Sequence, residues 1–330
     1  MRVWLSTFPR AGQTEQVARA AEASGFFGLL LTDSQCLLGD PFVELGAAAD
    51  ATSTLHLGTC ATNVVTRHPT VLASLAATLQ QRSGGRMHLG VGRGDSAVTK
   101  VGLRPLSVGA YGEALRSLRG LLRGESATFD GVEAALTWLD TDLPPTPVLG
   151  VASGPRTMAA AAGHADGLVL QVGSDPDAVA RCVDQVRVAS HGDGFTIAAY
   201  VVVGLEAGDG APPIDGVTPL LARMATATLG DTDTPQATAA AAADRDYTVA
   251  RHGLPATADA DVIAGYAING SADHCADRLR RIAASGCDEL VVILGSMTTP
   301  TDDLIELVQA FGTTVLPALA TGSPPRVDQR

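Results

Sequence analysis

The sequence predicts a single α/β domain with the (β/α)8 barrel fold of the TIM type, a closed ring of eight parallel strands linked by helices. Eight short apolar runs alternate with amphipathic segments along the chain. These runs are continuous rather than alternating, as is typical of parallel strands buried on both faces. The chain has 330 residues and is 46% hydrophobic, which is enough for one large core. Eight such strands are the number that closes this barrel.

Each strand is predicted from one apolar run. In chain order the runs are 2–7, 28–32, 55–62, 87–92, 147–152, 166–172, 195–204 and 289–295. The amphipathic segments between the first strands begin near Gln13, Pro41, Pro69 and Val108. Pro155 suits the first turn of the next helix, and Ser271 is a good cap for a helix that ends before Gly286.

Two segments interrupt the strand–helix repeat, one after strand four and one after strand seven. Residues 126–146 contain TFDG and PPTP, which predict a hairpin and an extended approach to strand five, placed over one end of the barrel. Residues 205–270 are acidic and rich in Ala, Thr and Pro, which favours a helical excursion that serves as a lid. We therefore expect one domain over 1–320 and a tail over 321–330.

Charge and composition argue against several partners. The net charge of −12 would repel a phosphate backbone, so nucleic acid is not expected as a partner. We read no apolar stretch as long enough to cross a bilayer and no secretory signal at the start, so we expect a cytoplasmic protein without a membrane partner. The five cysteines are scattered without C-x-x-C spacing, as expected of reduced structural thiols.

Other catalytic classes leave no pattern in the sequence. The seven histidines show neither H-x-H nor H-E-x-x-H spacing, so no metal is expected. No G-x-S-x-G elbow is present, which argues against a serine hydrolase. Lys100 is the only lysine, so Schiff-base chemistry would depend on that one side chain.

Polar residues gather where the predicted strands end. They are Thr32-Asp33-Ser34-Gln35 after strand two, Thr59 to Asn63 at the end of strand three, Gly92 to Ser96 after strand four and Ala152 to Pro155 after strand five. Active sites of this barrel lie at the carboxyl ends of its strands. We therefore expect these residues to surround the site.

The loop GVGRGDS lacks the G-x-G-x-x-G spacing of a dinucleotide fold. Its glycines would let backbone N–H groups approach an anion, with Arg93 and Ser96 as further donors, and Ser153-Gly154 offers a second such site. In the alternative interpretation, the glycines only form tight turns. Asp33 and Asp95 are candidates for a general acid or a partner of a ring nitrogen, although Asp33 also suits a helix or turn cap.

Residues 58–96 resemble the signature of the luciferase-like monooxygenase superfamily, whose members carry FMN or the deazaflavin F420. The patterns T-N-x-x-T-R-H-P and S-x-G-R-x-x-L-G-x-G-x-G-D-S are similar to the methylenetetrahydromethanopterin-reductase-like branch, many of whose members are assigned to F420. Segments 152–170 and 272–293 resemble the strand-five and strand-eight regions of the same family.

The resemblance implies a set of site residues. It places a non-prolyl cis peptide between Cys60 and Ala61, in a bulge of strand three that supports the cofactor ring. It places the cofactor phosphates on the loop that contains Gly92, Arg93, Gly94 and Ser96, and on Ser153 and Gly154. Thr59, Thr62, Asn63, Arg67 and His68 would line or support the ring pocket, although His68 also suits a helix cap. Asp95 would be the acid, and Asp33 would act in catalysis or cofactor binding.

The expected function is F420-dependent hydride transfer to or from a small organic substrate, a reductase or dehydrogenase reaction. Ser34 stands where several F420-dependent relatives have histidine, which argues against a mechanism with that histidine as base. An FMNH2-dependent monooxygenase is the alternative, and a flavin-binding protein without catalysis is a third. The family also implies a homodimer paired through helices beside strands two to four, such as the apolar segment 69–83.

Overall fold

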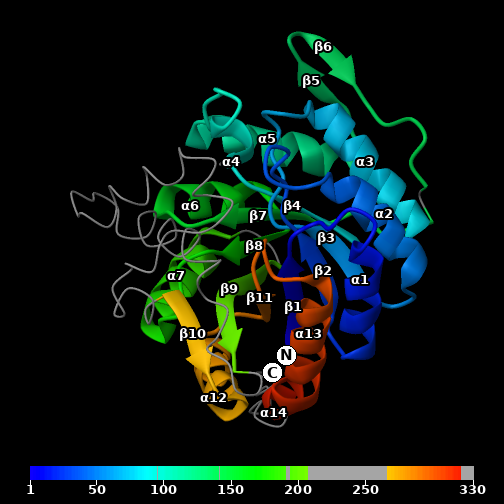
Figure 1. Ribbon diagram of the computed structural model, residues 1–330. Coiled ribbons are helices and arrows are strands. Elements are labelled where there is room, and N and C mark those ends of the chain that lie inside the picture. Colours follow the sequence, from blue (N-terminus) through cyan, green and yellow to red (C-terminus); the bar gives the residue numbers. More distant parts are fainter. Residues whose placement is uncertain (95, 141, 191–193, 207–265, 321–330) are drawn as a thin grey trace.

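The computed structural model describes residues 1–94, 96–140, 142–190, 194–206 and 266–320, and it shows a closed barrel of parallel strands surrounded by helices (Figure 1). Neighbours pair in the order β1-β2-β3-β4-β7-β8-β9-β11, and β11 pairs with β1 to close the ring. The eight strands are β1 Arg2–Thr7, β2 Gly28–Leu31, β3 His56–Thr59, β4 Met87–Val91, β7 Val148–Ala152, β8 Gly167–Leu170, β9 Thr196–Leu205 and β11 Glu289–Leu294. All eight correspond to predicted runs, so the predicted barrel is confirmed.

The continuous apolar runs fill two separate cores because successive side chains of a strand point to opposite faces. Leu5, Leu29 and Leu57 point outward into the layer between strands and helices. Trp4 and Leu30, their neighbours, point into the barrel. Both faces of each strand are therefore buried.

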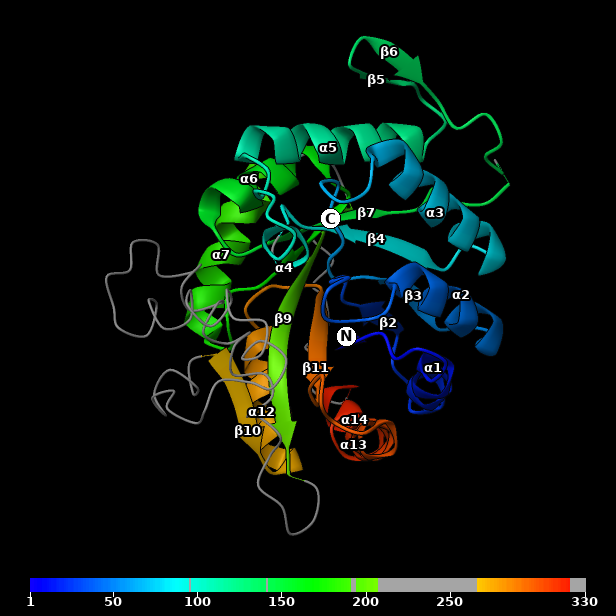
Figure 2. The ribbon, with the colours of Figure 1, turned by 45° about the horizontal axis from the view of Figure 1, so that its top comes forward.

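The helices surround this ring and cover its outer face (Figure 2). They are α1 Thr14–Ala23, α2 Pro41–Ala51, α3 Pro69–Arg82, α4 Ser96–Thr99, α5 Val108–Leu121, α6 Pro155–His164, α7 Pro176–Ala189, α12 Ala272–Ala283, α13 Thr301–Thr314 and α14 Leu316–Ala320. Pro155 occupies the first turn of α6, and the Ser271 side chain caps α12. Both features were predicted.

The end of the barrel where the strands begin is filled by aromatic and histidine side chains. His56 Nδ1 lies 3.0 Å from His88 Nε2, and the Trp4 ring packs on His88 with 4.9 Å between centroids. The Trp4 indole donates to Glu289 at 2.7 Å. Burial, the neighbouring His56 and the charge of Arg2 together lower the pKa of His88 to about 3. Burial, with the charges of Arg2 and Arg86, also lowers the pKa of His56. Both rings are therefore neutral near pH 7, and this end forms a packed floor.

The predicted hairpin is present as β5 Ala127–Phe129 and β6 Val132–Ala134. Its predicted position over a barrel end is wrong. It stands outside the ring of helices beside α3 and α5 (Figures 1 and 2). The Phe129 ring packs on His68 at the start of α3, with 4.8 Å between centroids. This apolar contact holds the hairpin against the outer helices.

The segment 205–270 was predicted to be helical, and its described end is not. Strand β10, Ala267–Gly270, runs parallel to the outer half of β9. The reason is that β9 extends to Leu205, farther than its neighbour β8, and so offers free backbone groups for another strand. Residues 207–265 and 321–330 lie outside the described part, so the lid, the tail and the 1–320 domain boundary stay predictions.

One stretch corrects the expectation that nothing in the chain could cross a bilayer. Among the described helices, Thr301–Ala320 has the necessary length and a mean hydropathy of 1.2. In the fold, its α13 portion is an outer helix of the barrel, and Phe311 stacks on Phe26 beside α1 at 5.6 Å between centroids. The apolar content therefore reflects packing between neighbouring helices.

Candidate active site at the carboxyl rim of the barrel

Strand three carries a bulge at the rim. Gly58 pairs with His88 and the next pairing joins Thr62 to Val91, so β3 has one residue more than β4 over this interval. The peptide bond between Cys60 and Ala61 is cis. Both features were predicted from the resemblance and are confirmed.

The Thr59 side chain replaces backbone pairing where the bulge interrupts the sheet. Its hydroxyl accepts from the Gly90 N–H at 3.1 Å and donates to the Gly90 carbonyl at 2.8 Å. Cys60 is buried, and burial raises the pKa of its thiol to about 12. Thr59 and Cys60 therefore belong to the barrel wall, and their contact with a cofactor stays a prediction.

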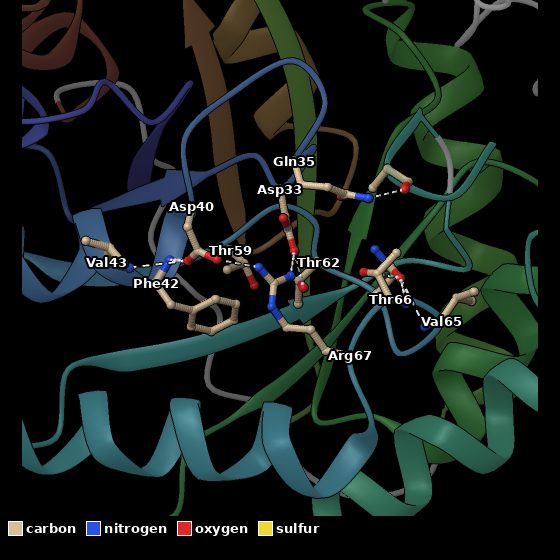
Figure 3. Close-up of polar contacts among 12 residues, drawn as sticks. Asp33, Gln35, Asp40, Phe42, Val43, Thr59, Thr62, Val65, Thr66 and Arg67 are labelled. Carbon is tan, nitrogen blue, oxygen red and sulfur yellow. Dashed lines mark hydrogen bonds and ion pairs between the residues drawn. The ribbon is translucent and has the colours of Figure 1, made fainter. Parts of the chain in front are cut away.

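Asp33 is the buried carboxylate of the rim, with its side chain only 1% exposed. Its Oδ2 accepts from the Thr62 hydroxyl at 2.6 Å and from Arg67 Nη1. Its Oδ1 is equally buried and has no hydrogen-bond partner. Figure 3 shows Asp33 and Thr62 together beside the Arg67 guanidinium. Asp33 therefore does not cap a helix, the alternative considered from the sequence.

Arg67 joins two carboxylates, a contact that the sequence analysis missed. Its Nη2 donates to Asp40 Oδ2 at 2.7 Å, while Asp40 Oδ1 caps α2 by accepting from the Phe42 N–H at 2.8 Å. The guanidinium carbon lies 5.2 Å from the centre of the Phe42 ring. Burial alone would lower the pKa of Arg67. The neighbouring carboxylates of Asp33 and Asp40 have the larger effect, so the pKa of Arg67 is raised.

The turn between Thr62 and Arg67 is held by Asn63. The Asn63 Oδ1 accepts from the N–H groups of Val65 and Thr66 at 3.0 and 2.9 Å. His68 next to Arg67 caps α3, because its Nδ1 accepts from the Thr70 N–H at 3.3 Å. Asn63 and His68 therefore organise the loop that presents Arg67. His68 is a helix cap, one of the two roles considered from the sequence.

The loop after β4 is fastened to its surroundings. Arg93 Nε donates to the Leu106 carbonyl at 2.7 Å, and the Leu106 N–H donates back to Arg93 at 2.9 Å. Gly94 has φ +99°, and a Cβ there would lie 2.5 Å from Val98, so both turn and space require glycine. Ser96 Oγ lies 3.0 Å from Ser34 Oγ, which joins the rim ends of β4 and β2. Asp95, the predicted acid, lies outside the described residues.

Ser153 and Gly154 precede α6 on the neighbouring strand β7. Gly154 is the cap position of this helix, and no side chain caps it, so its first N–H groups are suited to an anion. The Tyr111 hydroxyl donates to the Val91 carbonyl at 2.9 Å and accepts from the Val151 N–H at 3.1 Å. This bridge ties the end of β4 to β7, so the two predicted phosphate loops are neighbours.

The rim thus gathers a buried carboxylate, a pair of serine hydroxyls and two loops with backbone donors. Within the part of the chain that the structure describes, no three His, Cys, Asp or Glu side chains form a group that could hold a metal ion. This donor set is suited to an organic ligand that carries both hydrogen-bonding groups and an anionic end.

The sequence match decides the family. The model of the family described as luciferase-like monooxygenase matches residues 2–289. The chain belongs to the luciferase-like monooxygenase family. The rim described above is therefore the candidate active site of this luciferase-like chain.

Among curated relatives, this luciferase-like chain is 30% identical over 166 residues to a 5,10-methylenetetrahydromethanopterin reductase from Methanolobus tindarius, covering 48% of this chain and 50% of that protein. It is 33% identical over 165 residues to a phthiodiolone/phenolphthiodiolone dimycocerosates ketoreductase from Mycobacterium tuberculosis, covering 46% and 42%. The chain thus spans about half the length of the curated relatives it matches.

Solved structures share the fold over nearly the whole chain. The coenzyme F420-dependent tetrahydromethanopterin reductase from Methanopyrus kandleri matches with a TM-score of 0.74 and 21% identity, over 96% of this chain and 99% of that one. A monooxygenase from Streptomyces bottropensis matches with a TM-score of 0.69 and 21% identity, over 96% and 99%. At these identities the likeness concerns the luciferase-like barrel alone.

Proposed function

We propose that this luciferase-like enzyme is an F420-dependent oxidoreductase that transfers hydride to or from a small organic substrate. One observation carries the proposal. The rim has a buried carboxylate with an unused oxygen at Asp33, and two neighbouring loops, one with Gly92, Arg93, Gly94 and Ser96 and the other with Ser153 and Gly154. This arrangement suits a cofactor with a hydrogen-bonding ring at one end and phosphate at the other.

The choice of F420 over FMN rests on relatives. A methylenetetrahydromethanopterin reductase matches in sequence, and solved neighbours include an F420-dependent reductase and an F420-dependent secondary alcohol dehydrogenase. Monooxygenases among the solved neighbours support the alternative, an FMNH2-dependent monooxygenase. A flavin-binding protein without catalysis is a third candidate, which would bind cofactor and turn over no substrate.

When bound, the cofactor supplies the hydride chemistry, and the chain supplies binding, orientation and exclusion of water. Asp33 would contact the ring end, and Thr62 and Arg67 would hold Asp33 in place. Gly92, Arg93, Gly94 and Ser96 would contact phosphate from one loop, and Ser153 with Gly154 from the other. Asp95 would hold or deliver the substrate proton.

Separate titrations of the purified protein with F420 and with FMN test the proposed function. We expect micromolar or tighter binding of F420 and weaker binding of FMN, followed by the change in cofactor fluorescence. Tighter FMN binding together with substrate-dependent oxygen consumption would establish the monooxygenase instead. Binding of neither cofactor would exclude both.

We also propose a homodimer in the cytoplasm, with no nucleic-acid or membrane partner. Val43 on α2 and Val71 on α3 are 70% and 51% exposed, on the helices that the family resemblance assigns to pairing. Burial of these side chains against a second copy would remove apolar surface from water. Light scattering at micromolar concentration should give twice the chain mass, and a monomeric mass would refute the dimer. Cell fractionation tests the location.

A further inference from the structure

We propose that Ser34 is a positioning residue for the phosphate end of the site. Its hydroxyl donates to Ser96 Oγ, which leaves the Ser96 proton free to bond a phosphate oxygen of the cofactor, and Gln35 supports the short helix that carries Ser96. The inference rests on the proposed function and deepens it, because that function gives Ser96 a contact with phosphate and gives Ser34 and Gln35 no role.

Two consecutive side chains of the loop after β2 bond to the first two residues of α4. The hydroxyl oxygens of Ser34 and Ser96 lie 3.0 Å apart. Ser34 is 1% exposed, so Ser96 rather than bulk water is the partner of its hydroxyl. Beside this pair, Gln35 Nε2 donates to the Ala97 carbonyl at 2.6 Å, and Figure 3 draws this bond from the Gln35 amide. The loop after β2 is therefore fastened to α4 at two neighbouring points.

The direction of the hydrogen bond between the two serines decides what Ser96 can offer to a ligand. A serine hydroxyl has one proton to donate and two lone pairs that accept. If Ser96 gave its proton to Ser34, only lone pairs would face the ligand, and they would repel a phosphate oxygen. If Ser34 is the donor, Ser96 accepts on one lone pair and gives its own proton to phosphate, and each of the two bonds strengthens the other. An anion at Ser96 therefore selects Ser34 as the donor.

Helix α4 depends on support from outside, because it has only four residues and an isolated helix of this length is not stable in water. The carbonyls of Ser96 and Val98 accept N–H groups of the residues that follow α4, at 3.1 and 3.3 Å. At Ala97 between them, the Gln35 side chain is the donor. Gln35 therefore takes the place of a backbone donor in this short helix and helps to fix the position of Ser96.

The loop that carries Ser34 is itself held in place. The Ser34 carbonyl accepts the N–H groups of Leu37 and Leu38, both at 2.9 Å, which closes a turn behind the Ser34 hydroxyl. The preceding residue, Asp33, forms the buried ion pair with Arg67. The Ser34 hydroxyl is therefore presented to α4 from a fixed position, as the orientation of Ser96 requires.

Ser34→Ala tests the orientation of Ser96, because it removes one hydroxyl and adds no bulk. We expect the dissociation constant of F420 or FMN, whichever the wild type binds, to rise by about 3- to 10-fold. The deazaflavin that ends at its ribityl chain, or riboflavin for FMN, has no phosphate and should bind both proteins equally. A general structural defect would weaken both ligands alike. Ser53→Ala, an exposed change before β3 at the opposite end of the barrel, is the matched control and should weaken neither.

The double variant separates positioning from direct contact. Ser96→Ala should weaken the phosphate-bearing cofactor at least as much as Ser34→Ala does, since Ser96 gives the proton to phosphate. In the Ser96→Ala background, Ser34→Ala should have no further effect, because Ser34 acts through Ser96. A further loss as large as that of Ser34→Ala alone would show that Ser34 acts independently of Ser96.

Gln35→Leu tests the support of α4 in the protein without cofactor. We expect amide hydrogen exchange over residues 96–102 to become about 2- to 10-fold faster than in the wild type. Gln309→Leu, an exposed change on α13, is the matched control and should leave this exchange unchanged. Wild-type exchange in Gln35→Leu would refute the support by Gln35.

The outcomes separate the inference from the proposed function. If the wild type binds neither F420 nor FMN, both fail. If the wild type binds a cofactor and Ser34→Ala binds it equally well, the positioning role fails and the function stands. The positioning role also fails if Ser34→Ala weakens the phosphate-free ligand to the same extent, or if its effect persists in the Ser96→Ala background.

Discussion

Replacing Gly90 with alanine is expected to abolish the folded barrel. A Cβ at this position would lie 2.0 Å from the Thr59 carbonyl oxygen, a backbone atom that cannot rotate away. The Thr59 hydroxyl already holds both the N–H and the carbonyl of Gly90, so strands β3 and β4 have no room to separate without losing these bonds. Loss of soluble protein, or of the cooperative thermal transition in circular dichroism, is the expected result.

Gly163→Ala is the matched control for this substitution. Gly163 lies near the end of α6, and a Cβ there would meet nothing within 4 Å. Alanine in a helix is more stable than glycine by roughly 0.5–1 kcal/mol, so this variant should melt at the wild-type temperature or above it. A Gly90→Ala protein that melts like the wild type would show that β3 and β4 can move apart, against the tight bulge described above.

Asp95→Asn is expected to lower turnover by about 10²–10⁴-fold, because a positioned proton donor typically contributes that much to a rate. The affinity for the cofactor should stay within a few-fold, since the amide has the size of the carboxylate. The measurement is the rate of cofactor oxidation or reduction with a substrate found by screening, beside a separate binding titration. This prediction rests on the strand-end position of Asp95 and on the family resemblance.

Asp184→Asn is the control for this substitution, because Asp184 is exposed on α7. It should leave both the turnover rate and the affinity for the cofactor unchanged. Undiminished turnover in Asp95→Asn would mean that the substrate proton comes from another group or from water. A large loss of cofactor affinity would instead assign Asp95 to binding.

The barrel could be predicted from the sequence because its signal is local and repeated. Each strand corresponds to an apolar run such as 289–295, and eight such runs indicate a closed ring of eight strands. The hairpin was predicted as well, from the turn signal at TFDG, but its place was not. That place depends on Phe129 meeting His68, a contact between distant residues that no local pattern contains.

The candidate site, too, could be predicted from the sequence only in part. Parallel strands all end at one rim, so the grouping of Asp33 with the β4 and β7 loops follows from the fold class alone. The shared use of Arg67 by Asp33 and Asp40 does not follow, because side-chain partners depend on the exact path of each loop. The hydrogen bonds between Thr59 and Gly90 could not be predicted either, since they lie where β3 gains one residue over β4.

Closure of the ring also has a consequence for how the chain matures in the cell. Arg2 bonds to Glu289, 287 residues later, and β1 has β11 as one of its two neighbours. At roughly 5–20 residues per second, a ribosome needs on the order of 15–60 s to make that interval. For this time the first strand has one open edge, which other strands can pair with. Pairing with β11 removes this open edge, so the barrel is complete only after nearly the whole described chain has been made.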